Sequence, residues 1–231
     1  MELTVSAAAS LTDSLKEIQG LYEKEHSNVK LTFNFGSSGT LQQQIEQGAP
    51  ADLFISAGKK QLTALVDKQL IDNSGQTNLL TNELVVVIPA DSKTPLSGIE
   101  DVTKPEINKL AIGQPDTVPA GSYSRDALSY YKIWDQLQPK LVLAKDVRQV
   151  LTYVETGNVE AGFVYKTDAL TSSKVKAAFT VDPKSYKPIE YPMGIIKSTK
   201  HAKETQEFYQ YLLSKPAQDI FVKYGFTLAH K

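Results

Sequence analysis

Two serines in a turn of small residues are the first candidates for ligand chemistry in this sequence. The run GSSGT at residues 36–40 follows the strand-like run LTFNF and precedes apolar residues at helical spacing, which predicts a strand, a tight turn and a helix start. The first backbone N–H groups of a helix have no partner within it and attract anions, and the hydroxyls of Ser37 and Ser38 add donors. The turn predicts an anion site, although Ser38 as a simple helix cap explains the same residues.

A second serine turn lies near the start of the chain. The apolar residues 3–9 are followed by Ser10, and then by apolar residues recurring every three to four positions up to Tyr22. Ser10 with Asp13 resembles a capping box at the start of this helix. A serine hydroxyl has one proton and two lone pairs, so we expect Ser10 to cap the helix while donating its proton to an anion.

The second half of the chain repeats the order of strand, turn and helix. Strand-like residues 110–113 precede a turn at 118–121 that contains Ala120, and residues 141–144 precede a helix whose first turn contains Val147. These two positions offer backbone N–H groups at further helix starts. Strand-like residues 161–164 lead into Tyr165, for which packing and ligand binding are both open interpretations.

The predicted donors are uncharged. No Lys, Arg or His lies in the small-residue turns themselves, so an anion there would be held by hydrogen bonds and helix dipoles. A ligand with its own O–H would find no acceptor, and a buried unpaired donor costs about 1–3 kcal/mol. The pattern therefore favours an oxyanion without a proton. Asp146 and Arg148 flank Val147, and we expect them to form a structural or solvated pair.

The alternation of strands and helices predicts an α/β fold. Three strands alternate with three helices up to residue 70, as in a mostly parallel sheet covered by helices on both faces. Ligands of such sheets bind beyond the carboxyl ends of the strands, where Ser10 and Ser38 are placed. Two final helices, at 202–213 and 216–224, have core spacing and are expected to pack.

Composition limits the class of protein. The 231 residues have a net charge of −1 with 41% hydrophobic and 22% charged residues, an ordinary soluble balance without the basic cluster that nucleic acid requires. The absence of cysteine excludes thiol catalysis and thiolate zinc sites. No segment is apolar enough for a signal peptide or membrane span, and we expect Met1 to replace a cleaved leader.

The chain resembles the molybdate- and tungstate-binding proteins that serve as extracytoplasmic receptors of ABC importers. Five segments carry the resemblance: AAASLTDSL at 7–15, FGSSGTLQQQIEQGAPADLFIS at 35–56, PDTVPAGSYSRDAL at 115–128, AKDVRQVL at 144–151 and GFVYKTDA at 162–169. The resemblance implies that the oxyanion is bound by Ser10, Ser38, Tyr165 and the backbone amides of Ala120 and Val147. Gly39 stands where relatives often have another serine.

The resemblance also implies an architecture and partners. We expect a two-lobed periplasmic-binding-protein fold, with residues 1–81 and 193–231 in one lobe, residues 82–192 in the other, and the ligand in the cleft between lobes that close like a hinge. The implied ligand is molybdate or tungstate, with no cofactor. The implied partner is the membrane permease of an ABC importer, and the protein is expected to be a monomer located in the periplasm or anchored as a lipoprotein.

Other classes of function account less well for the sequence. A ferric-ion receptor of related fold would use adjacent tyrosines such as Tyr130 and Tyr131, but these lie within a predicted helix and no histidine is near another candidate ligand, so we expect no bare metal ion. A sulfate-type receptor of the same fold is a further alternative. A hydrolase on a related fold would need a nucleophile and a base, whereas GSSG differs from G-x-S-x-G, and we expect no catalytic residues. A transcription regulator would need a DNA-binding module, for which neither end has room.

Overall fold

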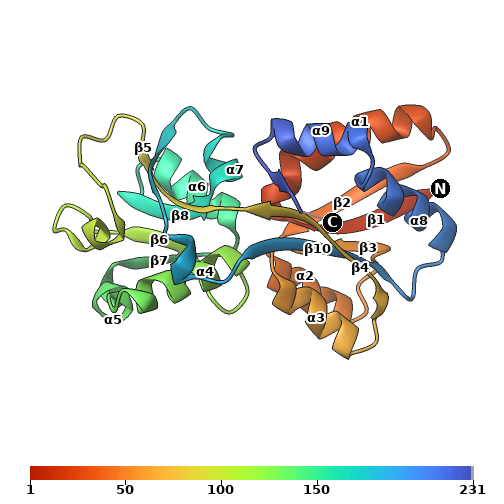
Figure 1. Cartoon of the computed structure of the whole chain (residues 1–231), viewed down its shortest axis with the longest axis horizontal. Helices are drawn as coiled ribbons and strands as arrows, with labels where there is room; N and C mark the ends of the chain where they lie inside the picture. Colours follow the sequence, from red (N-terminus) through yellow and green to blue (C-terminus); the bar gives the residue numbers. More distant parts are fainter. Residues whose placement is uncertain (230–231) are drawn as a thin grey trace. The chain divides into compact units, whose positions relative to one another are not determined.

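The computed structural model describes residues 1–229 and divides the chain into two compact units (Figure 1). The first unit comprises Met1–Thr81 and Glu190–Lys231, and the second comprises Asn82–Ile189. Residues 230 and 231, which belong to the first lobe expected from the sequence, lie outside the described residues. The second boundary lies between 189 and 190, whereas the sequence placed it between 192 and 193.

The first unit is built on a six-stranded sheet of order β11-β4-β10-β3-β1-β2. β1 pairs in parallel with β2 and β3, whereas β10 is antiparallel to β3, and β11 is antiparallel to β4. The predicted parallel sheet is therefore confirmed for β1, β2 and β3, and the first two of these strands lead into the serine turns. The strands are β1 (Glu2–Ala8), β2 (Lys30–Gly36), β3 (Leu53–Ile55), β4 (Ile71–Asn82), β10 (Ile189–Ile196) and β11 (Thr227–Leu228).

Helices cover both faces of this sheet. Figure 1 shows α1, α8 and α9 on one face and α2 and α3 on the other. In α1, Leu15, Ile18 and Tyr22 recur at helical spacing and all are buried, so a single apolar stripe fixes the helix against the sheet. The helices are α1 (Thr12–Glu25), α2 (Ser38–Glu46), α3 (Lys59–Asp67), α8 (Ala202–Leu212) and α9 (Lys215–Lys223), with a 3₁₀ turn, η1, at Ala9–Leu11.

The second unit has a five-stranded sheet of order β7-β6-β8-β5-β9. β6 is parallel to β7 and β8, and β5 is antiparallel to β8 and β9. Its strands are β5 (Leu84–Pro89), β6 (Leu110–Gly113), β7 (Leu141–Ala144), β8 (Ala161–Tyr165) and β9 (Val175–Thr180). Its helices are α4 (Pro119–Tyr130), α5 (Trp134–Leu137), α6 (Val147–Glu155) and α7 (Lys166–Ala169), with 3₁₀ turns η2 (Ile99–Thr103), η3 (Gln138–Lys140) and η4 (Pro183–Ser185).

The α/β class predicted from the sequence is confirmed, and the largest omission is β4. This strand contains the run DNSGQTN, whose residues are exposed or half-buried, so it lacks the apolar alternation that indicates a strand. The two C-terminal helices pack as expected, with Phe208 and Phe221 fully buried. Among residues 1–229, no helix is both long enough and apolar enough to span a bilayer.

Candidate functional site

The turn between β2 and α2 separates the roles of its two serines. Ser37, not Ser38, is the N-cap of α2: its oxygen accepts from the N–H of Thr40 at 3.3 Å, and its hydroxyl donates to the Thr40 side chain at 2.8 Å. Ser38 is the first residue of the helix, and its side-chain oxygen accepts from the backbone N–H of Ala57 at 2.9 Å. The alternative interpretation of Ser38 as a simple helix cap is therefore excluded. Capping by Ser37 leaves the hydroxyl proton of Ser38 available as a donor.

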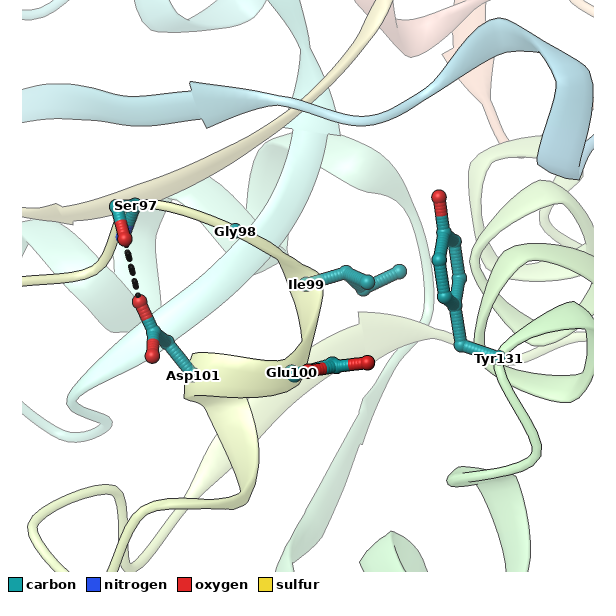
Figure 2. Close-up of a pocket in the computed structure, with 6 residues that line it drawn as sticks. All are labelled: Ser97, Gly98, Ile99, Glu100, Asp101 and Tyr131. Atoms are coloured by element: carbon teal, nitrogen blue, oxygen red, sulfur yellow. Dashed lines mark hydrogen bonds between the residues drawn. The ribbon is translucent and has the colours of Figure 1, made fainter.

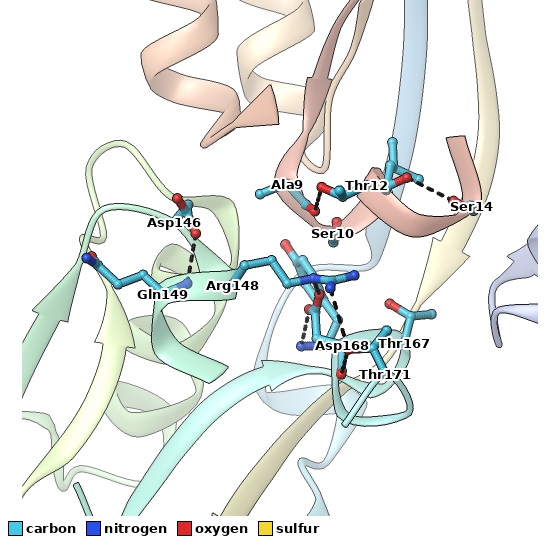
Figure 3. A network of polar contacts seen from close by, with 12 residues as sticks. Ala9, Ser10, Thr12, Ser14, Asp146, Arg148, Gln149, Thr167, Asp168 and Thr171 are labelled. Carbon is cyan, nitrogen blue, oxygen red and sulfur yellow. Dashed lines mark hydrogen bonds and ion pairs between the residues drawn. The ribbon is translucent and has the colours of Figure 1, made fainter. Parts of the chain in front are cut away.

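Ser10 lies in the 3₁₀ turn between β1 and α1. The residue that precedes α1 is Leu11, which makes no side-chain cap, so Ser10 does not occupy the N-cap position that the sequence predicted for it. The Ser10 oxygen instead lies 3.0 Å from the hydroxyl oxygen of Tyr191 on β10. Nearby, the side chain of Thr12 donates to the carbonyl of Ala9 at 2.7 Å and stabilises the turn (Figure 3).

The register of the sheet brings the two serine turns of the first unit to one edge. β1 and β2 run parallel with Ala8 opposite Gly36, so both strands end at the same level. Ser10 and Ser38 follow these two ends, as the sequence predicted for a parallel sheet. Both serines are buried, so a charged ligand reaching them would have to exchange water for these hydroxyls.

In the second unit, Ala120 lies in the first turn of α4. The helix begins at Pro119, which has no N–H to lose at this position. A methyl group at Gly121 would lie 1.9 Å from the carbonyl oxygen of Gly113, so only glycine lets α4 begin directly against the end of β6. The N–H groups of Ala120 and Gly121 are thereby placed at the carboxyl end of the sheet without partners inside the helix.

Val147 is the first residue of α6. Asp146 caps this helix by accepting from the N–H of Gln149 at 2.9 Å, which leaves the earlier N–H groups of the first turn outside the cap. β6 and β7 are parallel with Gly113 opposite Ala144, so α4 and α6 begin at the same edge of the second sheet. The sheet thus places Ala120 and Val147 in comparable positions, and both residues are buried.

Tyr165 ends β8 and is buried with its neighbours. Its backbone N–H donates to Asp168 at 3.1 Å, and the same carboxylate receives the Nε–H of Arg148 at 2.7 Å (Figure 3). Arg148 therefore forms its ion pair with Asp168, whereas Asp146 serves as a helix cap. Asp146 and Arg148 were expected from the sequence to pair with each other, and in the structure each has a different partner.

Sequence reasoning missed the residues that support these donors. Ser38 is contacted by Ala57, and Ser10 by Tyr191. Arg148 is contacted by Asp168. Each of these contacts joins positions at least 19 residues apart in the chain. No local spacing indicates such pairs. For Asp168 a partial signal existed. A carboxylate at the third position of a helix can accept from the backbone N–H of the residue just before that helix, and here that residue is Tyr165.

A separate hollow in the second unit has the wrong charge for an anion. It has a volume of about 340 Å³ and is lined by residues 97–101 and Tyr131 (Figure 2). The backbone N–H of Ser97 and the ammonium of Lys104 hold the pKa of Asp101 well below its usual value, so this side chain is a carboxylate at neutral pH. With Glu100 beside it, the hollow would repel an oxyanion.

In the part of the chain that the structure describes, nothing supports a metal centre. Tyr130 and Tyr131 lie at the end of α4, where Tyr130 is largely exposed and the hydroxyl of Tyr131 donates to Asp182 at 3.4 Å. Across residues 1–229, no three or more His, Cys, Asp or Glu side chains are grouped as a metal ion would require. The donors gathered at the strand ends are hydroxyls and amides, which suit an anion.

Comparisons with known proteins agree with an anion receptor. A family model described as bacterial extracellular solute-binding protein matches residues 3–227. YvgL of Bacillus subtilis (strain 168), provisionally assigned as an ABC transporter substrate-binding lipoprotein, is 50% identical over 225 residues, or 97% of this chain and 86% of that protein. The molybdate-binding protein ModA of Escherichia coli (strain K12) is 42% identical over 236 residues, or 98% and 89%. The periplasmic molybdate-binding protein of Azotobacter vinelandii has a TM-score of 0.89 at 23% identity over 99% of this chain and all of that one, which shows a shared fold.

Proposed function

The chain belongs to the family of bacterial extracellular solute-binding proteins, and we propose that it binds molybdate, and also tungstate, for delivery to the membrane permease of an ABC importer. The similarity to the molybdate-binding protein of Escherichia coli over nearly the whole chain supports this ligand. As a solute-binding protein it acts outside the cytoplasm, and we further propose that it binds without catalysis, as a monomer held in the periplasm or by a lipid anchor.

The observation that carries the proposal is that Ser37 and Ser38 make different contacts. Because Ser37 caps α2 and the N–H of Ala57 occupies one lone pair of Ser38, the proton of the Ser38 hydroxyl is the group left to meet a ligand. A hydroxyl arranged in this way recognises an acceptor. A serine needed only as a cap would make the contacts that Ser37 makes.

We propose that one oxyanion takes hydrogen bonds from both units. Its donors would be the hydroxyls of Ser10, Ser38 and Tyr165 and the backbone N–H groups of Ala120 and Val147. A ligand that uses all five donors stabilises the arrangement in which both units contact it, because its affinity is higher for that arrangement than for any other. Closure on the ligand would then be the signal that the permease recognises.

The chemistry of this donor set selects a fully deprotonated tetrahedral anion. All five positions are no more than 4% exposed, so a bound anion would exchange its water shell for fixed donors. A proton on the ligand would face a donor, and an unpaired buried donor costs about 1–3 kcal/mol. Phosphate species that carry a proton at neutral pH are disfavoured on this ground, whereas molybdate, tungstate and sulfate satisfy the requirement.

Calorimetric titration with molybdate, tungstate, sulfate and phosphate tests the proposal directly. We expect molybdate and tungstate to bind and to raise the melting temperature, because a ligand of the native state stabilises it by RT ln(1 + [L]/Kd). Phosphate should bind weakly or not at all because of its proton, and we expect the same of sulfate because the similarity is to molybdate-binding proteins. Tighter binding of sulfate would overturn the molybdate assignment while leaving an oxyanion receptor, and no binding of any of the four would overturn both.

A further inference from the structure

We infer that Arg148 and Asp168 are positioning residues for the bound oxyanion, holding Val147 and Tyr165 in fixed relation to each other. The inference rests on the proposed function, because it assigns a role toward the same ligand. We do not propose that either side chain touches the anion. Each acts through the neighbouring residue whose N–H or hydroxyl is proposed to do so.

The Asp168 carboxylate is the centre of the arrangement. It is fully buried, and each of its oxygens accepts a hydrogen bond from a different element. One oxygen receives the Nε–H of Arg148, from the first turn of α6, at 2.7 Å. The other receives the backbone N–H of Tyr165, at the end of β8, at 3.1 Å. A single carboxylate therefore joins the two places that carry proposed ligand donors.

Arg148 reaches further along the same segment. It follows Val147 in the chain, and its Nη1 lies 3.5 Å from the hydroxyl oxygen of Thr171, which itself donates to the carbonyl of Asp168 at 2.7 Å (Figure 3). The guanidinium thus contacts both the carboxylate and the turn that follows α7. Because guanidinium donors are fixed in one plane, these contacts restrict the orientation of the first turn of α6.

The pairing also sets the charge near the ligand. A guanidinium with no carboxylate beside Val147 would attract anions of every kind, whereas Asp168 neutralises it. Selection is then left to the geometry of the uncharged donors. Buried ion pairs add little net stability, and their clearest use is to fix one conformation among several. In metal sites, groups that orient the direct ligands commonly alter affinity by about 10- to 100-fold when removed, and we take the same range for this anion.

The chain provides a matched control for this pair. Arg125 and Asp116 form an Arg–Asp pair in the same unit at 3.4 Å, but here the carboxylate side chain is largely exposed and the arginine is partly exposed. We expect Arg148→Gln to raise the Kd for molybdate by roughly 10- to 100-fold, Arg148→Lys to raise it less because the charge remains, and Arg125→Gln to leave it within about twofold. Asp168→Asn should resemble Arg148→Gln. Should Asp168→Asn fail to fold, the two Arg148 variants decide the outcome.

A double-mutant cycle separates positioning from a purely structural role. In a Tyr165→Phe background, Arg148→Gln should raise the Kd less than it does in the wild-type chain, because part of its effect passes through Tyr165. In a Ser38→Ala background its effect should be fully additive. An Arg148→Gln protein with a lower melting temperature but the wild-type Kd, or equal additivity in both backgrounds, would overturn the inference alone. A wild-type chain that binds none of the four oxyanions would instead overturn the proposed function, and the inference with it.

Discussion

The side-chain oxygen of Ser38 accepts a hydrogen bond from the backbone N–H of Ala57 at 2.9 Å, although the two residues belong to different strand–helix turns. This contact ties the start of α2 to the loop that precedes α3. It also fixes which part of the hydroxyl is available, because an oxygen that accepts from one side directs its proton elsewhere. Ser38 is therefore built as a donor, and Ser37 next to it is built as a cap.

Substitution of these neighbouring serines should separate binding from stability. Ser38→Ala removes a donor to a charged ligand, which is worth about 1.5–3 kcal/mol, so the Kd for molybdate should rise roughly 10- to 100-fold. Ser37→Ala removes the cap, and should lower the free energy of unfolding by about 1 kcal/mol with little change in Kd. Calorimetry and urea denaturation of both variants give the two readouts. Equal Kd values for the two variants would contradict the assignment of Ser38 as a ligand donor and Ser37 as a helix cap.

Tyr191→Phe should weaken binding through Ser10. The two hydroxyl oxygens are 3.0 Å apart, both residues are buried, and either hydroxyl can donate in this contact. A tyrosine that donates here directs the serine proton elsewhere. The phenylalanine ring keeps the edge contact with Phe226, and the loss of one hydrogen bond, about 1 kcal/mol, predicts a Kd roughly fivefold higher. Tyr209→Phe is the control, because it removes a hydroxyl bonded to Thr77 in the same unit. If both variants retain the wild-type Kd in calorimetry, Tyr191 has no orienting role.

The sequence predicts the strand–turn–helix units well because their signals are local. β2, β6 and β7 appear at the expected residues, and the turns after them fall at helix starts. Apolar periodicity and small residues determine these features within about a dozen positions. Strand β4 has no such periodicity: its polar run is held by pairing with other strands, and only the folded sheet reveals it.

The chemistry of individual turns depends on backbone detail that spacing does not specify. Ser10 lies in a 3₁₀ turn, so α1 starts one residue later than it would if Ser10 were its N-cap. The choice between Ser37 and Ser38 as cap depends on a shift of one residue in the helix start. Contacts such as that of Tyr191 with Ser10, 181 residues apart, depend on the tertiary fold and have no local signal.

Acid should destabilise the first unit partly through Glu17. Hydrogen bonds from Lys223 and Tyr224, each at 2.8 Å, lower the pKa of this carboxyl below its ordinary value. A folded-state pKa below the unfolded one means that the stabilisation is complete above the unfolded value, about 4.3, and is lost as the pH falls through the folded value. Glu17→Gln should therefore flatten the fall of the melting temperature below about pH 4.3.

The comparison for Glu17 is made by thermal denaturation from neutral pH downward. The exposed pair of Lys215 with Asp219 supplies the control, and Asp219→Asn should leave the acid limb of the curve nearly as steep as in the wild-type chain. Identical acid limbs for Glu17→Gln and the wild-type chain would show that the contact between α1 and α9 contributes nothing to acid stability.

Gly121→Ala should damage both the fold and the ligand site of the second unit, because the added methyl group would lie 1.9 Å from the carbonyl oxygen of Gly113. That oxygen belongs to the backbone of β6 and cannot rotate away, so α4 must shift and take the N–H of Ala120 with it. We expect a loss of about 3 kcal/mol or more in the free energy of unfolding and a weaker Kd for molybdate at temperatures where the variant is folded. Gly20→Ala is the matched control: a methyl group there meets nothing within 4 Å, and alanine in the middle of α1 should stabilise the protein by about 0.5–1 kcal/mol without altering the Kd. A Gly121→Ala protein with wild-type stability would mean that α4 does not need its close approach to β6. A Gly121→Ala protein with reduced stability but the wild-type Kd would mean that Ala120 does not contact the ligand.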